Sequence, residues 1–234
     1  MFRLLLLGCS IHALIAADEP LILPDLATLR VVDGVVLILP EPGTRVDLAA
    51  RPVDGPWPGV EAPLTLNAGY VDTEDRPKGW RVIDGVETAA RTTDRTQSGV
   101  AVRMQEAWSL SWLAQAPAQP RTALQAGPFL IDPGGDLGIR TDRGHRARRT
   151  AIGQFVDGRC FFALTRDAVT LLSFAQSILA LPETAGLPRV VALLNLDGGP
   201  ATGLHVTGHP AWSLTPTGPV ADVWTLGPKP PAAP

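Results

Sequence analysis

Four short segments of the sequence join small residues to polar ones at the ends of apolar stretches. They are Asn67-Ala68-Gly69-Tyr70, Gln125-Ala126-Gly127-Pro128, Arg149-Thr150-Ala151-Ile152-Gly153 and Asn195-Leu196-Asp197-Gly198-Gly199. An apolar strand that ends in Asp197-Gly198-Gly199 places a carboxylate where glycines let the backbone approach a ligand closely. Asp197 is therefore the first candidate for a catalytic group. Taken alone, each segment is also explained by a tight turn.

Arg149 and the residues before it offer positive charge to an anionic ligand. The planar guanidinium group matches the paired oxygens of a phosphate, which makes Arg149 a candidate anion anchor. The stretch 140–149 holds further basic side chains in a chain of net charge −3, namely Arg140, Arg143, His145, Arg146 and Arg148. Such a stretch steers an anionic substrate, or it is a solvated loop whose charge serves solubility.

Asp197 and Asn67 have complementary chemistry for cleaving a sugar linkage. A carboxyl group serves as nucleophile or as general acid or base, and Asn67 is a neutral hydrogen-bonding group for a sugar or phosphate oxygen. Asp72 and Asp132 are candidate second carboxylates, although each also fits a turn. Cysteine occurs only at positions 9 and 160, so a cysteine-based zinc site is excluded. We predict no cofactor and no metal site, and a divalent cation on Asp197 and Asn195 stays open.

The composition favours a scaffold built from short strands. Gly and Pro number 23 each, a density that disfavours helical bundles. Strands or hairpins are expected where the sequence is apolar or alternating: 30–39, 45–50, 63–70, 79–86, 100–113, 123–132, 150–165 and 189–197. Asp33-Gly34 and Asp157-Gly158 predict two hairpins, because a type I′ turn needs positive φ angles at its central residues.

One segment has the spacing of an amphipathic helix. Apolar side chains recur there at helical intervals: Leu171, Phe174, Ala175, Ile178 and Leu179. Thr170 precedes them and is suited to cap the first N–H groups, so we expect a helix over 171–181 that Pro182 ends and that packs on a sheet. The predicted fold is a single α+β domain, β-rich, with mixed or antiparallel sheets and one or two packed helices.

Residues 1–17 have the pattern of a secretory signal peptide: a cationic start, an apolar run over 4–16 and small residues before Asp18. The run is too short to cross a bilayer, and no other stretch is long enough, so no transmembrane span is expected. The alternative interpretation is a lipobox at Cys9, which would give a lipid-anchored envelope protein. The predicted organisation is a signal peptide over 1–17, a domain over 18–226 and a flexible Pro/Ala tail over 227–234.

In their order and spacing, the four segments resemble the phosphodiester glycosidase family (N-acetylglucosamine-1-phosphodiester alpha-N-acetylglucosaminidase-like domains). The similar motifs are an Asn-x-Gly-aromatic segment, a Gly-Pro strand, Arg-Thr-Ala-Ile-Gly, a hairpin, a helix and Leu-Asp-Gly-Gly, over residues 62–205. The resemblance implies catalytic roles for Asp197, Asn67 and Arg149. It implies substrate contacts from Gly69, Tyr70, Gln125, Gly127, Thr150, Gly198, Gly199 and Thr202.

The resemblance also implies an activity, namely hydrolysis of glycosyl phosphodiester linkages. Together with the signal-peptide pattern, it predicts a secreted or periplasmic enzyme that acts on envelope polymers or exported glycans. The partner is then a carbohydrate or sugar-phosphate substrate, and a net charge of −3 argues against nucleic acid. Pro200-Ala201 departs from the family, where small hydroxyl residues usually follow Asp-Gly-Gly. That departure motivates the alternative, a catalytically inactive carbohydrate- or polymer-binding module of the same fold. The oligomeric state stays open.

Overall fold

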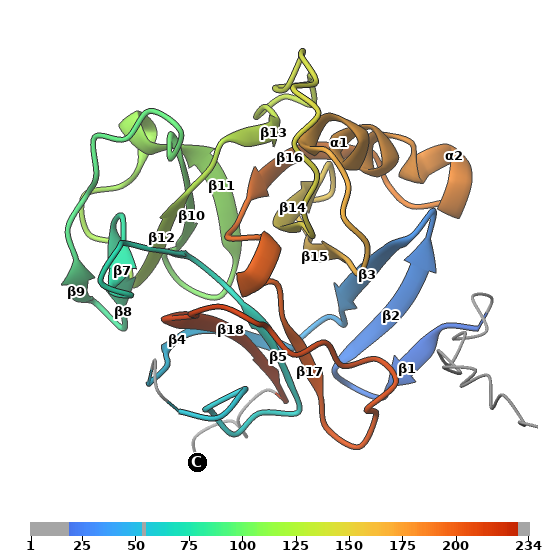
Figure 1. Ribbon diagram of the computed structural model, residues 1–234, viewed down its shortest axis with the longest axis horizontal. Coiled ribbons are helices and arrows are strands. Elements are labelled where there is room, and N and C mark those ends of the chain that lie inside the picture. Colours follow the sequence, from blue (N-terminus) through green and yellow to red (C-terminus); the bar gives the residue numbers. More distant parts are fainter. Residues whose placement is uncertain (1–18, 53–54, 229–234) are drawn as a thin grey trace, which may run out of the picture.

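Alternating apolar stretches and Gly-containing turns fold the chain into antiparallel strands. The computed structural model describes residues 19–52 and 55–228 and arranges the strands in four sheets, with two helices beside one of them (Figure 1). The predicted β-rich α+β class is confirmed, and every strand pair in the described residues is antiparallel. The predictions for residues 1–17 and for the end of the tail, 229–234, lie outside the described residues.

The largest sheet has seven strands in the order β1-β2-β3-β15-β14-β16-β13. Their bounds are Leu21–Leu23 (β1), Ala27–Val32 (β2), Val35–Pro40 (β3), Phe129–Ile131 (β13), Thr150–Phe155 (β14), Cys160–Thr165 (β15) and Val190–Asn195 (β16). Both predicted hairpins are confirmed as β2–β3 and β14–β15. Asp33 and Gly34 both have positive φ, as a type I′ turn requires, whereas at Asp157-Gly158 only the glycine does.

The helix α1 (Leu171–Leu179) covers one face of this sheet. Thr170 caps it by accepting the N–H of Ser173 at 3.1 Å, as its sequence predicts. Phe174, Ala175 and Ile178 are buried in a core that includes side chains of the sheet.

The predicted end of the helix at Pro182 is wrong. The helix α1 ends at Leu179, and Pro182 lies in the first turn of a second helix, α2 (Leu181–Ala185). A proline is tolerated there because the first N–H groups of a helix have no partner within the helix. Pro182 therefore lies in the first turn of a helix, where the sequence predicted the end of one.

The other sheets hold five, four and two strands, in the orders β11-β10-β12-β8-β9, β17-β5-β18-β4 and β6-β7. Their bounds are Arg45–Ala50 (β4), Leu64–Asn67 (β5), Tyr70–Val71 (β6), Pro77–Lys78 (β7), Arg81–Ile83 (β8), Val86–Ala89 (β9), Gly99–Arg103 (β10), Trp108–Trp112 (β11), Thr122–Ala126 (β12), Leu204–Val206 (β17) and Asp222–Gly227 (β18). The strand β18 thus includes Gly227, which the sequence analysis assigned to the tail. Short 3₁₀ helices span Leu113–Gln115 and Gly199–Ala201.

A second core joins the three larger sheets. Leu66 of β5, Phe162 of β15 and Trp224 of β18 are fully buried in it, and the Trp108 and Trp224 rings meet edge to face at 4.7 Å. No helix in residues 19–52 and 55–228 is long and apolar enough to cross a membrane.

The stretch 123–132 does not form one continuous strand but divides between two sheets. It breaks at Gly127-Pro128, because proline has no N–H for a ladder bond, so β12 joins the five-stranded sheet and β13 the seven-stranded one. At the break, the Gly127 N–H donates to the Asn195 carbonyl at 3.0 Å, so the end of β12 lies beside the end of β16, where the candidate site lies.

Candidate active site

Asn67, at the end of β5, is buried and forms hydrogen bonds with three other segments of the chain. Its Nδ2 atom donates to the Asp197 carbonyl oxygen at 2.6 Å, and its Oδ1 atom accepts from the Thr150 hydroxyl and the Gly203 N–H, each at 3.0 Å. The structure therefore brings the predicted Asn67, Thr150 and Asp197 together. The Asn67 amide holds the Asp197 turn against β14 and has its hydrogen bonds within the protein.

Asp197 follows β16 in a turn and presents a half-buried carboxyl group. Its N–H donates to the Ala68 carbonyl at 3.2 Å, and its Oδ1 atom accepts the Gly198 N–H at 2.9 Å. Burial raises the pKa of the Asp197 carboxyl to about 6, against the opposing effects of the Gly198 hydrogen bond and the charge of Arg81. The carboxyl can therefore hold or release a proton near neutral pH, which is the property of a general acid or base.

Tyr70 connects the Asp197 turn to Arg149 electrostatically. Its hydroxyl donates to the Gly127 carbonyl at 2.7 Å and accepts from Asn195 Nδ2 at 2.5 Å. Burial and the charge of Asp197 raise the pKa of Tyr70 well above its usual range, and Arg149 opposes them. Tyr70 thus stays neutral within the electrostatic influence of both charged groups.

Gly127 is needed for this arrangement. It has φ +145°, and a Cβ atom built on it would lie 2.5 Å from the Thr96 carbonyl oxygen. Any larger residue would push Thr96 away and displace the carbonyl that receives the Tyr70 hydroxyl. Gly127 therefore supports Tyr70 through its backbone.

Arg149 is 8% exposed and lies immediately before β14. Its Nε atom donates to the Val169 carbonyl at 3.0 Å and its Nη2 atom to the His145 carbonyl at 2.7 Å. Burial lowers the pKa of Arg149 from its usual value. One edge of the guanidinium group is thus bound to the protein, while Nη1 has no hydrogen-bond partner among the described residues.

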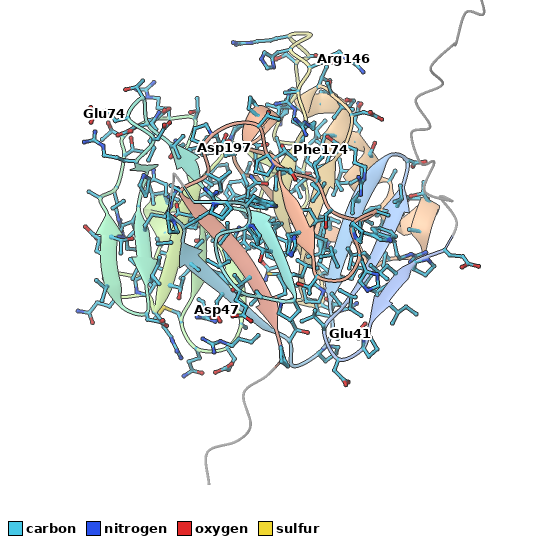
Figure 2. All side chains as sticks on the ribbon, turned by 60° about the horizontal axis from the view of Figure 1, so that its bottom comes forward. Glu41, Asp47, Glu74, Arg146, Phe174 and Asp197 are labelled. Atoms are coloured by element: carbon cyan, nitrogen blue, oxygen red, sulfur yellow. The ribbon has the colours of Figure 1, made fainter. Side chains whose placement is uncertain are left out.

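Arg149 lines a pocket of about 430 Å³ between the segment 138–145, Pro128 and the start of α1. Arg140 and Arg143 also line it, together with one acidic residue, Asp142. The loop that carries these residues projects from the molecule beside α1 (Figure 1), and Figure 2 shows Arg146 at its outer part and Asp197 at the same end of the domain, away from Asp47 and Glu41. The volume is in the range of small-molecule sites.

A buried ion pair behind the site was missed from the sequence. Arg81 Nε lies 2.7 Å from Asp222 Oδ2, and the two side chains are 0% and 1% exposed. Arg81 Nη2 also donates to the Tyr70 carbonyl at 3.3 Å. A Cβ atom on Gly69 would lie 1.7 Å from that nitrogen, so only glycine admits the guanidinium group here. The one signal in the sequence was a charged residue inside the predicted strand 79–86.

Gln125, like Arg81, is a buried polar residue whose hydrogen bonds are made within the protein. Its Oε1 atom accepts from the N–H groups of Trp80 and Thr92, and its Nε2 atom donates to the carbonyls of Thr92 and Gln97. All four hydrogen-bonding positions of the buried amide are therefore used within the protein. Gln125 holds the loop before β10, and the substrate contact predicted for it stays a prediction.

The glycines after Asp197 admit the turn close to β14. A Cβ atom on Gly198 would lie 2.8 Å from the Arg148 carbonyl oxygen, and Gly199 has φ +59°. The Gly199 N–H donates to that same carbonyl at 2.8 Å. Thr202 is fully buried, with its hydroxyl 3.5 Å from that of Thr150.

Pro200-Ala201, where the chain departs from the family pattern, lies in packed structure. The Pro200 carbonyl accepts the N–H groups of Thr217 and Gly218 at 2.8 and 3.0 Å. Ala201 is buried in a small apolar cluster with Val220 and Val223. Pro200 and Ala201 therefore contact other parts of the protein.

The two candidate second carboxylates both lie in turns. Asp72 accepts the Glu74 and Arg76 N–H groups and pairs with the Arg76 side chain at 2.9 Å. Asp132 closes a turn by bonding to Asp136 through its backbone. In the described part of the chain, no three His, Cys, Asp or Glu side chains are grouped to hold a metal ion.

The fold and the site define a β-rich α+β domain in which Asp197 has a pKa near neutral pH and the buried Arg149 lines a basic pocket. The phosphodiester glycosidase family model matches residues 61–226, and this chain belongs to that family. No curated protein matches it at a significant level.

Solved structures share the fold at low sequence identity. The catalytic domain of zebrafish N-acetylglucosamine-1-phosphodiester alpha-N-acetylglucosaminidase, auto-inhibited by its pro-peptide, is similar with a TM-score of 0.58 and 14% identity, over 86% of this chain and 77% of that one. A hypothetical protein from Synechocystis is similar with a TM-score of 0.53 and 16% identity, over 86% of this chain and 61% of that one. Both comparisons establish the architecture.

Proposed function

We propose that this chain hydrolyses glycosyl phosphodiester linkages, with Asp197 as general acid and Arg149 as the anchor of the phosphate. The observation that supports the proposal most strongly is the convergence of three distant segments. The segments after β5, before β14 and after β16 place Tyr70 where the charges of both Asp197 and Arg149 act on it. Membership of the phosphodiester glycosidase family supports the same reaction class.

Arg149 suits the negative charge of a phosphodiester. Two of its nitrogens are held by backbone carbonyls, which fix the guanidinium group, and Nη1 is left to donate to a phosphate oxygen. A buried cation without a carboxylate partner is stabilised when an anion binds next to it. Binding the phosphate therefore supplies the counter-charge that Arg149 lacks among residues 19–52 and 55–228.

Asp197 suits the proton transfer. A bound anion near the carboxyl group favours its protonated form, so the pKa of about 6 in the free protein rises in the complex. The leaving phosphate monoester has a second pKa of about 6 as well, so a proton moves between the two with little energetic difference. Because the leaving phosphate monoester is itself acidic, it needs little help from a general acid, and one carboxyl group is enough.

The proposed reaction breaks the bond between the sugar carbon and the bridging oxygen. Asp197 donates its proton to that oxygen while water attacks the anomeric carbon and loses a proton to solvent. The products are a free sugar and a phosphate monoester held by Arg149. Tyr70, whose hydroxyl bonds to Gly127 and Asn195, stays neutral within the electrostatic influence of both charged groups.

Substitution of Asp197 by Asn tests this proposal. Turnover of a chromogenic glycosyl phosphodiester should fall at least about a hundredfold, because Asn keeps the shape and cannot donate the proton. Asp157→Asn, in the exposed β14–β15 turn, is the matched control and should keep its rate. In ¹⁸O-labelled water the label should appear in the sugar.

An unchanged rate in Asp197→Asn would remove the carboxyl group from the reaction, and label in the phosphate would show cleavage at phosphorus. A wild-type protein that binds a sugar phosphate but turns over no glycosyl phosphodiester would instead establish the alternative, an inactive binding module of this fold.

We also propose that the protein is exported to the cell envelope or beyond, where sugar-phosphate polymers are found. The support is the signal-peptide pattern of residues 1–17. N-terminal sequencing of the mature protein should begin at Asp18. A lipid-modified N-terminus at Cys9 would contradict this and establish a membrane-anchored form.

A further inference from the structure

The exposed side of the pocket carries two arginines, of which Arg140 also acts electrostatically on Asp132. Arg140 and Arg143 line the pocket, are exposed and form no ion pair within residues 19–52 and 55–228. Some exposed arginines pair with a carboxylate, as Arg76 does with Asp72 and Arg159 with Asp157, so what sets Arg140 and Arg143 apart is their place on the pocket. We call Arg140 and Arg143 the basic wall. Its two charges face the same cavity as the Arg149 side chain.

The pocket also receives the N-terminal end of α1. Leu171 and Leu172 line the cavity, and their N–H groups are among the first of the helix, which have no acceptor within it. Thr170 caps only Ser173. The partial positive charge at this end adds to that of the arginines.

One acidic side chain opposes these charges. Asp142 lines the pocket, and hydrogen bonds from the Gly144 N–H and the Thr170 hydroxyl hold its pKa below the usual range. It is therefore ionised at neutral pH, and its carboxylate is engaged by the Gly144 N–H at 2.7 Å. Three arginines against one aspartate leave the pocket positive in a chain whose net charge is −3.

The volume of the pocket is larger than the volume that one phosphate group occupies. About 430 Å³ equals the liquid volume of roughly fourteen water molecules at about 30 Å³ each. Arg149 is buried and held by the protein, whereas the basic wall is exposed. The cavity is thus lined by one buried and two exposed arginines, and its volume admits a sugar unit in addition to a phosphate.

We propose that the basic wall binds a second phosphate, so that the natural substrate is a polymer whose sugars are joined by successive phosphodiesters. This rests on the proposed function: Arg149 holds the phosphate of the linkage being cut, and the wall holds the phosphate of the next repeat. A second charge held by the protein lowers KM for the polymer and makes its cleavage depend strongly on salt.

The test compares two substrates of the same sugar, one with a single phosphodiester and one with two. Arg140→Gln/Arg143→Gln should lower the ratio of kcat/KM for the two-phosphate over the one-phosphate substrate about tenfold at low salt. Arg45→Gln/Arg159→Gln, which removes the same charge at other surface positions, should keep the wild-type ratio. A ratio near one in the wild type, or an unchanged ratio in the wall variant, would overturn the second phosphate position.

A binding measurement separates this inference from the hydrolase proposal. Inorganic triphosphate should bind the wild-type protein at least about tenfold more tightly than inorganic phosphate, and the wall variant should lose that difference. If neither substrate is cleaved but the triphosphate preference depends on the wall, the hydrolase proposal fails and the anion position stands. If the one-phosphate substrate is cleaved and triphosphate shows no preference, the second position fails alone.

Discussion

The arginines on the two sides of the site differ in burial and in ion pairing. Arg81, behind the site, is fully buried, pairs with Asp222 and donates to backbone carbonyls around it. Arg140 and Arg143, in front of it, are exposed and have no ion pair in the described chain. We call Asn67, Arg81, Gln125 and Asp222 the buried support. A polar group whose bonds are all within the protein fixes structure, and one that lacks partners is available to a ligand.

The largest expected effect is on stability, in the buried support. Asp222→Ala leaves the Arg81 charge buried without its partner and should lower the free energy of unfolding by about 3–5 kcal/mol. Urea unfolding measures this. Arg140→Gln, on the basic wall, should change it by less than about 0.5 kcal/mol. Equal effects in the two variants would abolish the distinction between support and wall.

The next effect is on activity, at Arg149, which combines a feature of each region. It is bound to backbone carbonyls on one side and leaves Nη1 for the ligand. Arg149→Lys should lower kcat/KM about a hundredfold, close to Arg149→Ala, because lysine cannot hold both carbonyls and still reach the anion. A lysine variant with nearly full activity would show that only the charge matters.

A smaller effect is expected at Asn67. Asn67→Ala leaves the Thr150 hydroxyl, the Gly203 N–H and the Asp197 carbonyl without their partner, so unfolding should become easier by about 1–3 kcal/mol. Gln154→Ala is the control, because its hydrogen bonds are long, at 3.3–3.5 Å. A greater loss of unfolding free energy in Gln154→Ala than in Asn67→Ala would show that the Asn67 amide does not stabilise the fold.

The strands and the hairpins could be predicted from the sequence because their signals are local. The alternation of β4 and the Asp33-Gly34 turn need no distant information, and both are confirmed. Thr170 before an apolar helical pattern likewise identifies the start of α1. The end of that helix failed as a prediction, because Pro182 is acceptable at the beginning of a helix as well as after its end.

The buried support could not be found locally. Arg81 and Asp222 are 141 residues apart in the sequence, and their pairing depends on how β8 and β18 meet across two sheets. Gln125 fits a ligand-binding motif by its place beside Gly127-Pro128, and only the fold shows all its hydrogen bonds used within the protein. Polar residues in such motifs divide between support and ligand contact according to partners that sequence spacing does not specify.

The pH dependence of kcat/KM for a single-phosphate diester tests the central claim, that Asp197 acts as a protonated acid beside the Arg149 anion position. This profile reports the free protein, in which burial raises the pKa of Asp197 to about 6. The acid is protonated below that pH and ionised above it. The rate should therefore be level below about pH 6 and fall about tenfold per pH unit above it, and Asp197→Asn should lack this decline. A rate that rises through pH 6 would show that the ionised carboxylate does the work, and a wild-type profile unchanged by the substitution would contradict the account.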